Sequence, residues 1–547
     1  MKKHRTILTG VATYALGLAA FVGCNDPFPP DTTDHGLEDC AASEDWIIDS
    51  TGSYVQTPPL EMFKPLPHPT TECPFYRGGW QNFLRATQPD ANGKPALVTA
   101  AYPTIDDVFS PRIPHGTNRS YLGDIKQAGQ REILIDQNGN TLYYSIEVNP
   151  AFADFIHENH LETAKAIQAY PSNPAMKNLF FPAGVAEFKA AWQVVEGADQ
   201  AAIDAQTQDY ISIVSSVPTM HATTDPKTGA KVITENRDQP RNGITLRLLA
   251  LHVVFTLPGH PEFIWASFEH TKGAPDAASV DLRRDLAPIL GHPTTDTSQP
   301  VSMTPDFYSL YKPGTPISKS NSSIPEADLN LNEATQKFLD PNTGAPQQTS
   351  IFRVFSGSKS NTDEPDQAIT SLNHNMEFIF NKASTMGALP ANDKRQFYRL
   401  LGGQWMDQPQ YFHVDFPIQN DLTNPYAQLP NSDADLLAGG VGVGPSKFTE
   451  SIKTEGSDSP YSILAGEVRM SSTAMESFTQ PQGNFNNCFT CHNTQAINSN
   501  GVPVVRQAGS IKLLDPGLLN VSHIISQFVL EDCGSNLDPT GTQAICP

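Results

Sequence analysis

Near its C-terminus the chain carries the motif Cys488-Phe489-Thr490-Cys491-His492. Two residues between the cysteines place both sulfurs on one helical turn, from which each thiol can add to a vinyl group of a porphyrin. The histidine that follows can then bind the iron as its proximal ligand. This pattern predicts a single covalently attached haem c, bound by Cys488, Cys491 and His492.

Three other interpretations of the motif are weaker. A thioredoxin-like dithiol needs a strand and turn leading into a helix, but residues 483–487 read as a loop. A zinc site needs a second ligand pair at short spacing, and none follows. A disulfide between the two cysteines is the third alternative. Haem attachment is therefore the favoured interpretation.

The first 24 residues have the pattern of an export signal. Residues 1–5 are basic, residues 7–22 are mostly apolar, and Phe21-Val22-Gly23-Cys24 is similar to a bacterial lipobox. We expect a lipoprotein signal peptide over residues 1–23 and lipid on Cys24, with an ordinary secretory peptide as the alternative. A transmembrane anchor is disfavoured because the apolar run is short and interrupted. Both favoured interpretations predict export to the periplasm or cell surface, where haem c is attached.

The remaining cysteines fit an oxidising compartment. Of seven in the chain, three are used by lipid and haem, which leaves Cys40, Cys73, Cys533 and Cys546 for disulfides. Pairing Cys40 with Cys73 and Cys533 with Cys546 closes two local loops and is the favoured arrangement. The two crossed pairings stay open.

Charge limits the partners. The chain has 36 basic and 58 acidic residues, which argues against nucleic acid and against an electrostatic hold on anionic lipid. The expected membrane contact is the lipid anchor alone, and Asn25 after the lipidated cysteine favours the outer membrane over the inner. The acidic surface suits a basic redox partner, although solubility alone also explains it.

The pattern of elements predicts an α+β fold, with a mixed, β-rich central region and a mostly helical or loop-like C-terminal haem region. After the signal peptide we expect a tether and disulfide-stapled lobe (24–95), a mixed domain (96–290), a Pro/Ser/Thr-rich insertion or linker (291–350) and the haem region (351–547). No segment after the signal is long and apolar enough to span a bilayer.

Local patterns predict individual elements. Strands are expected at 131–135, 141–148, 183–195, 244–257 and 263–270, and helices from 150 to about 170 and at 363–386, 391–402 and 520–530. The Asn138-Gly139 pair predicts a tight turn between the first two strands. Asp136, Asn138 and Asn140 alternate like calcium ligands, but the downstream glutamate is absent, so a plain turn is favoured.

The second axial ligand of the iron decides the chemistry, because a methionine or histidine favours electron transfer and an open position permits catalysis. No methionine follows His492. The distal candidates are Met475, His523, His252 and His270. For each, packing or a structural role is the commoner use. Glu269, His270 and His252 are also candidates for proton transfer at an open site.

With these residues placed, the chain resembles exported bacterial proteins of the cytochrome c family. The resemblance covers residues 180–192 (Phe-Phe-Pro-Ala-Gly-Val-Ala-Glu-Phe-Lys-Ala-Ala-Trp), 263–270 and 471–480, followed by the Cys-x-x-Cys-His motif. It implies a single covalent haem and a redox role. Two-haem peroxidases and rubber oxygenases are similar in size and export, but they carry two attachment motifs, and this chain has one.

The leading hypothesis is a lipid-anchored mono-haem c-type cytochrome that transfers single electrons at the periplasmic face of a Gram-negative envelope. The chain is several times longer than the roughly 100 residues of one ordinary domain. Its length therefore supports an alternative, a haem-dependent oxidoreductase of oxygenase or peroxidase type with an open distal site. A second alternative is a cell-surface binding protein with structural haem.

Overall fold

The computed structural model describes residues 40–55, 72–109, 122–128, 132–170, 173–176, 179–225, 229–258, 260–276, 300, 308–354, 367–406, 464–466, 470, 472–478, 480, 488, 492, 519, 522 and 524–525. The expected signal peptide, Cys24, Cys491, His523, Cys533 and Cys546 lie outside these residues. The helices and strands below all belong to one compact unit that begins at Asp39.

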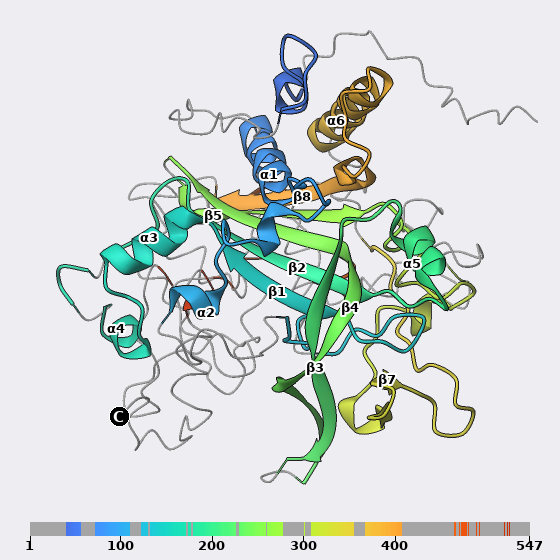
Figure 1. Cartoon of the computed structure of the whole chain (residues 1–547). Helices are drawn as coiled ribbons and strands as arrows, with labels where there is room; N and C mark the ends of the chain where they lie inside the picture. The colour runs from blue at the N-terminus through green and yellow to red at the C-terminus, as the bar shows by residue number, and fades with distance from the viewer. Residues whose placement is uncertain are drawn as a thin grey trace, which may run out of the picture. The chain divides into compact units, whose positions relative to one another are not determined.

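A seven-stranded antiparallel sheet organises the fold (Figure 1). Its hydrogen-bonded order is β1 (Tyr143–Val148), β2 (Ala186–Val194), β4 (Lys231–Leu257), β5 (His260–His270), β8 (Tyr398–Met406) and β9 (Leu464–Gly466), and β3 (Ser212–Thr224) pairs with β4. The helices and this antiparallel sheet confirm the α+β class. The strands expected at 183–195, 244–257 and 263–270 correspond to β2, the second half of β4, and β5.

Two helices, α1 (Cys73–Ala86) and α6 (Gln367–Thr385), cover one face of the sheet (Figure 1). Phe83 of α1 stacks on Phe268 of β5, with the ring centroids 4.4 Å apart. A Cβ on Gly79 would lie 3.0 Å from the Cβ of Ala266, so glycine lets α1 approach the sheet closely. Helix α1, which lies within the expected disulfide-stapled lobe (24–95), thus belongs to the apolar core on this face of the sheet.

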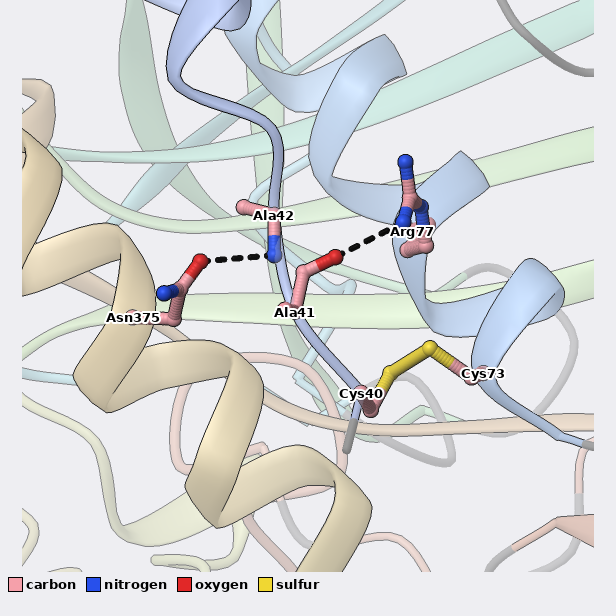
Figure 2. Close-up of a disulfide and its surroundings, with 6 residues drawn as sticks. All are labelled: Cys40, Ala41, Ala42, Cys73, Arg77 and Asn375. Atoms are coloured by element: carbon pink, nitrogen blue, oxygen red, sulfur yellow. Dashed lines mark hydrogen bonds between the residues drawn. A yellow bond between two sulfur atoms is a disulfide. The ribbon is translucent and has the colours of Figure 1, made fainter. Parts of the chain in front are cut away.

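The expected disulfide between Cys40 and Cys73 forms at the start of α1 (Figure 2). Beside it, Arg77 Nη1 donates to the carbonyl of Ala41 at 2.8 Å, and the N–H of Ala42 donates to Asn375 Oδ1 at 2.7 Å. The bond and its neighbours thereby hold the segment that begins at residue 40 against both α1 and α6. The short helix η1 (Glu44–Trp46) follows.

The opposite face of the sheet carries α2 (Ile105–Val108), α3 (Pro150–Glu158) and α4 (Ala164–Ala169). The side chain of Asn149 caps α3 by accepting the N–H of Phe152 at 3.0 Å. The single helix expected from 150 to about 170 is wrong, because His160 adopts a left-handed φ of 55° and Thr163 caps a new helix. Helix α5 (Gln200–Thr207) connects β2 to β3.

Residues 308–354 pack against the rest of the chain, although their composition suggested an insertion or linker. The N–H of Phe338 donates to Gly139 O at 2.8 Å, and the N–H of Thr349 donates to Ile135 O at 3.1 Å. Four short elements lie in this segment: η5 (Ile317–Lys319), η6 (Glu326–Asp328), β6 (Leu331–Asn332) and β7 (Lys337–Phe338). Two other short helices lie outside it, η2 (Ala96–Val98) and η7 (Arg395–Phe397).

The expected tight turn at 136–140 forms, with Gly139 at φ 81°. Asp136 Oδ1 accepts the N–H groups of Asn138 and Asn140 at 2.8 and 2.9 Å, so the acidic residue stabilises a turn. The strand expected at 141–148 is β1. The strand expected at 131–135 does not form over residues 132–135, which meet residues 141 and 142 through the bridge Ile135–Thr141 and the N–H of Leu142, which donates to Leu134 O at 3.0 Å.

One helix prediction is confirmed and another is wrong. The helical pattern at 363–386 corresponds to α6, which spans Gln367–Thr385. The helix expected at 391–402 is instead η7 followed by strand β8, because residues 398–404 pair with β5. Only residues 522, 524 and 525 of the expected 520–530 helix are described. Within the described part of the chain, no helix has the length and apolar character needed to cross a membrane.

Candidate haem-attachment site

The sheet face opposite α1 and α6 has three neighbouring cross-strand rows of side chains. Strand register aligns Tyr144–Ala191–Ala250–Glu269 in the first row, Ile146–Lys189–His252–Ser267 in the second and Val148–Glu187–Val254–Trp265–Gln404 in the third. Because cross-strand partners share a face, each row forms a strip across the sheet. The middle strip is the polar one.

This polar middle strip separates two apolar clusters. The first contains Tyr144, Ala191 and Ala250, and the described residues Ala474, Met475 and Phe478 pack into it. The second contains Val254 and Trp265 together with α3, and Leu519, Ile524, Ile525 and Cys488 pack against it. The described C-terminal residues therefore lie along both sides of the strip.

The attachment motif lies on the third row. The N–H of His492 donates to the carbonyl of Cys488 at 2.8 Å, which is the i to i+4 bond of a helical turn. The N–H of Cys488 donates to Oε1 of the buried Gln404 at 2.8 Å, and the His492 ring lies 4.0 Å from the ring of Trp265. Since Trp265 and Gln404 are direct partners between β5 and β8, one cross-strand pair contacts both described motif residues.

The residues present fit a covalent haem. Cys488 is half-buried, and its backbone is held at the sheet by Gln404. The helical turn puts Cys488 and His492 on the same side of the chain, as porphyrin attachment requires. Among the described residues no group of three or more His, Cys, Asp or Glu side chains is arranged to hold a metal ion.

His270 has a structural environment. Its Nε2 donates to the carbonyl of Asp209 at 3.0 Å, its Nδ1 accepts the N–H of Lys272 at 3.0 Å, and its ring stacks on Tyr210 at 3.6 Å. Burial lowers the pKa of His270 to about 3, so the ring is neutral. Both ring nitrogens are occupied by the backbone, which leaves none for an iron or an oxidant.

Glu269 is fully buried in an ion network. Arg353 donates to both Glu269 and Asp276, and Arg399 donates to Asp276 at 2.6 Å. The hydroxyl groups of Ser472 and Thr473 also donate to Glu269, at 2.7 and 3.0 Å. This carboxylate therefore anchors the segment that precedes the attachment motif.

Of the two ligand candidates near the motif in sequence, the structure describes Met475. Met475 is buried in the first apolar cluster, whereas Cys488 packs against the second. His523 lies outside the described residues. His252, the last of the distal candidates, lies in the polar middle strip.

Around His252 the structure gathers titratable groups that sequence reasoning missed. Glu476 Oε1 lies 3.1 Å from His252 Nε2, and Lys189 is the direct cross-strand partner of His252. Glu187, two residues from Lys189, accepts a hydrogen bond from Ser522. The alternation of Glu187 and Lys189 with apolar residues in β2 was the signal, because period-two polarity marks a face that is not plain core. No comparable pattern in the sequence marked Gln404 as a contact of the attachment motif.

Neither family models, nor curated proteins, nor solved structures give a match to this chain.

Proposed function

We propose that this chain is an exported, lipid-anchored mono-haem c-type cytochrome that transfers single electrons. The observation that carries the proposal is the helical turn from Cys488 to His492, which is docked on the cross-strand pair Trp265 and Gln404. A bound haem c would supply an iron that cycles between ferric and ferrous states.

The chain's own residues have three tasks in this proposal. Cys488 and Cys491 fix the porphyrin through thioether bonds, and His492 is the proximal ligand. Trp265 packs against the His492 ring and limits its rotation, because the two rings lie 4.0 Å apart and tilted by 43°. Gln404 holds the start of the turn through the N–H of Cys488. The expected partner is a redox protein, for which the acidic surface suits a basic face.

Expression in a host with haem-ligation machinery tests the proposal. We expect a red protein whose colour survives acid-acetone extraction and whose haem content is one per chain. The Cys488→Ser/Cys491→Ser variant should be exported without covalent haem, whereas Cys40→Ser should keep it. A colourless wild-type protein would contradict the proposal.

The polar strip favours one second candidate, a haem-dependent oxidoreductase with an open distal site. His252, Glu476 and Lys189 lie together on the face that receives the attachment turn, and such groups can move protons. A high-spin iron that binds cyanide or carbon monoxide would support this candidate. A low-spin iron that binds neither supports the electron carrier.

A further inference from the structure

Phe180 exposes an aromatic ring beside the second apolar cluster. Its side chain is 42% exposed, and its chain neighbours Leu179 and Phe181 both pack into that cluster. Two further apolar residues of the same segment, Pro182 and Ala183, are exposed as well. A contiguous exposed apolar surface marks an interaction site more often than a single exposed apolar residue does.

Hydrogen bonds hold the backbone of this segment. The hydroxyl of Thr256 donates to the carbonyl of Pro182 at 2.6 Å, and Asn149 Nδ2 donates to the carbonyl of Gly184 at 2.7 Å. Asn149 is also the residue that caps α3. The exposed ring therefore belongs to a surface whose shape is set before any partner binds, and this lowers the ordering cost of binding.

A series of ring contacts leads from this segment to the attachment motif. Measured between ring centroids, Phe181 lies 5.1 Å from Phe263, and Phe263 lies 6.1 Å from Trp265. Trp265 in turn lies 4.0 Å from the ring of His492. A partner seated on Phe180 would thus contact the part of the surface that lies over the motif's own apolar cluster.

The helices beside this segment are acidic. Helix α3 adjoins it, because the ring of Phe155 lies 5.0 Å from that of Phe181, and α2 contacts α3 (Figure 1). The described residues 101–109 and 150–163 include no lysine or arginine but have five carboxyl side chains: Asp106, Asp107, Asp154, Glu158 and Glu162.

Asp154 and Glu158 form an exposed pair on α3. They are one helical turn apart, and like charges at this spacing repel each other. Two of the other carboxyl groups have local roles, since Glu162 lies 3.2 Å from His157 and Asp107 caps α2. A cationic group placed over Asp154 and Glu158 would relieve their repulsion, whereas an anionic group would add to it. Charge complementarity therefore selects a basic partner.

The Phe180 surface is defined here as Phe180, Pro182 and Ala183 together with Asp154 and Glu158. We propose that it docks a redox protein that has a basic face. This inference rests on the proposed function, because the partner exchanges an electron with the haem. An aromatic centre with a polar rim is the usual composition of an interface, and transient redox complexes bury less than roughly 1,200 Å². In the docked pair the chain gives one electron to the partner's oxidised group, or takes one from its reduced group, and no atom is transferred.

Methyl NMR of the full mature holoprotein, labelled at its alanine methyl groups, tests the docking site. The probe is a small unlabelled cytochrome c with a net positive charge. At about 10 mM salt we expect the methyl signal of Ala183 to shift as the probe is added, and that of Ala388, beyond α6, to stay in place. Raising the salt to about 150 mM shortens the Debye length from about 30 Å to about 8 Å and should weaken the binding.

Two variants separate the contributions of charge and apolar contact. Asp154→Asn/Glu158→Gln should weaken binding roughly threefold to tenfold at low salt and reduce its salt dependence, because each exposed ion pair contributes modestly. Phe180→Ser should weaken binding at both salt concentrations. The control Asp45→Asn/Glu377→Gln removes two charges from exposed residues on the α1 and α6 side, and it should weaken binding less than the α3 pair does.

Separate outcomes overturn the proposal. If the control pair weakens binding as much as the α3 pair, the probe responds to net charge alone. If Phe180→Ser changes the sedimentation of the protein by itself, the surface pairs two copies of this chain instead. The Cys488→Ser/Cys491→Ser variant, which carries no haem, should bind the probe as the holoprotein does. A red protein whose Ala183 methyl signal does not respond fails only this inference, whereas a colourless wild-type protein fails the proposed function and with it the redox role of the partner.

Discussion

Glu147 shows how strongly position in the sheet controls a single side chain. It is an ordinary-looking glutamate in the strand Tyr143–Val148, yet it is 1% exposed. Burial raises the pKa of Glu147 to about 8, and the hydroxyl of Ser145 opposes the shift. The carboxyl group is therefore protonated in the folded protein at neutral pH.

This burial predicts a pH dependence of stability. The folded state holds a proton on Glu147 between its ordinary pKa of 4.5 and about 8, whereas the unfolded state releases it. The free energy of unfolding should therefore fall as pH rises through this window. Glu147→Gln should remove that part of the slope and be more stable than the wild type at pH 9, by roughly 1–3 kcal/mol. Urea denaturation at pH 5 and pH 9 measures this, and the exposed Glu158→Gln is the control.

Gln404 is the second residue whose role comes from its position. Gln404→Leu should leave the N–H of Cys488 without this acceptor and lower the stability by roughly 1–2 kcal/mol. Hydrogen exchange at the Cys488 amide should become faster, and less haem should be attached per chain. Gln404→Glu keeps an acceptor oxygen at the same place and should restore slow exchange. Equal exchange in the leucine variant and the wild type would show that this bond does not hold the turn.

At the scale of elements, three turns of the chain use the same device. At Asp49, Asp90 and Asp136 the N–H of the aspartate donates to the carbonyl four residues on, and a glycine three residues on donates its N–H back. Each glycine has a positive φ, which permits the tight reversal. An Asp-x-x-Gly pattern is local, so the sequence alone can locate such turns.

The edge of β3 is protected by side chains rather than by another strand. Gln336, in the turn between β6 and β7, accepts the N–H of Met220 and donates to its carbonyl at 3.0 Å, as a partner strand would. Glu333 accepts the N–H of Ala222 at 3.0 Å. These side chains occupy backbone groups that would otherwise invite pairing with another molecule.

Gln336→Ala should therefore expose the edge of β3. We expect a loss of roughly 2 kcal/mol in the free energy of unfolding, because two buried backbone groups lose their partner. The amide of Met220 should also exchange faster. The neighbouring Thr335→Ala changes an exposed residue and serves as the control. If both variants exchange alike at Met220, the side-chain bonds contribute nothing to the edge.

At the scale of the molecule, the sheet joins segments that are far apart in sequence. Strand β8 pairs with β5, although residues 271–397 separate the two strands in the sequence. Helix α1, from much earlier in the chain, packs on both strands. A chain restricted to residues 96–290 would lack both α1 and β8. It would expose Phe268 and the edge of β5.

We therefore expect the isolated 96–290 fragment to aggregate or remain without fixed tertiary structure. Near-UV circular dichroism and one-dimensional NMR of the fragment and of the full mature chain make the comparison. A fragment with dispersed NMR signals and a cooperative unfolding transition would show that this region folds by itself.

Local chemistry, readable from the sequence, determined the turn at 136–140, the strands at 186–194 and 260–270, helix α6 and the Cys40–Cys73 pair. Each depends on residues close together or on a strong period. The attachment motif can likewise be recognised from local sequence, because its two cysteines and histidine lie within one helical turn. Lipidation of Cys24 and the Cys533–Cys546 pair stay predictions.

Only the tertiary structure decided the rest. Residues 398–406 became a strand because β5 offered hydrogen bonds, and α1 became a core helix because the sheet buried it. The register of β2, β4 and β5 placed Lys189, His252 and Trp265 on one face, and the C-terminal segment brought Glu476 and His492 to them. A sequence records the alternation of side chains along each strand. Which strands become neighbours depends on the long-range burial of apolar surface, which no single segment contains.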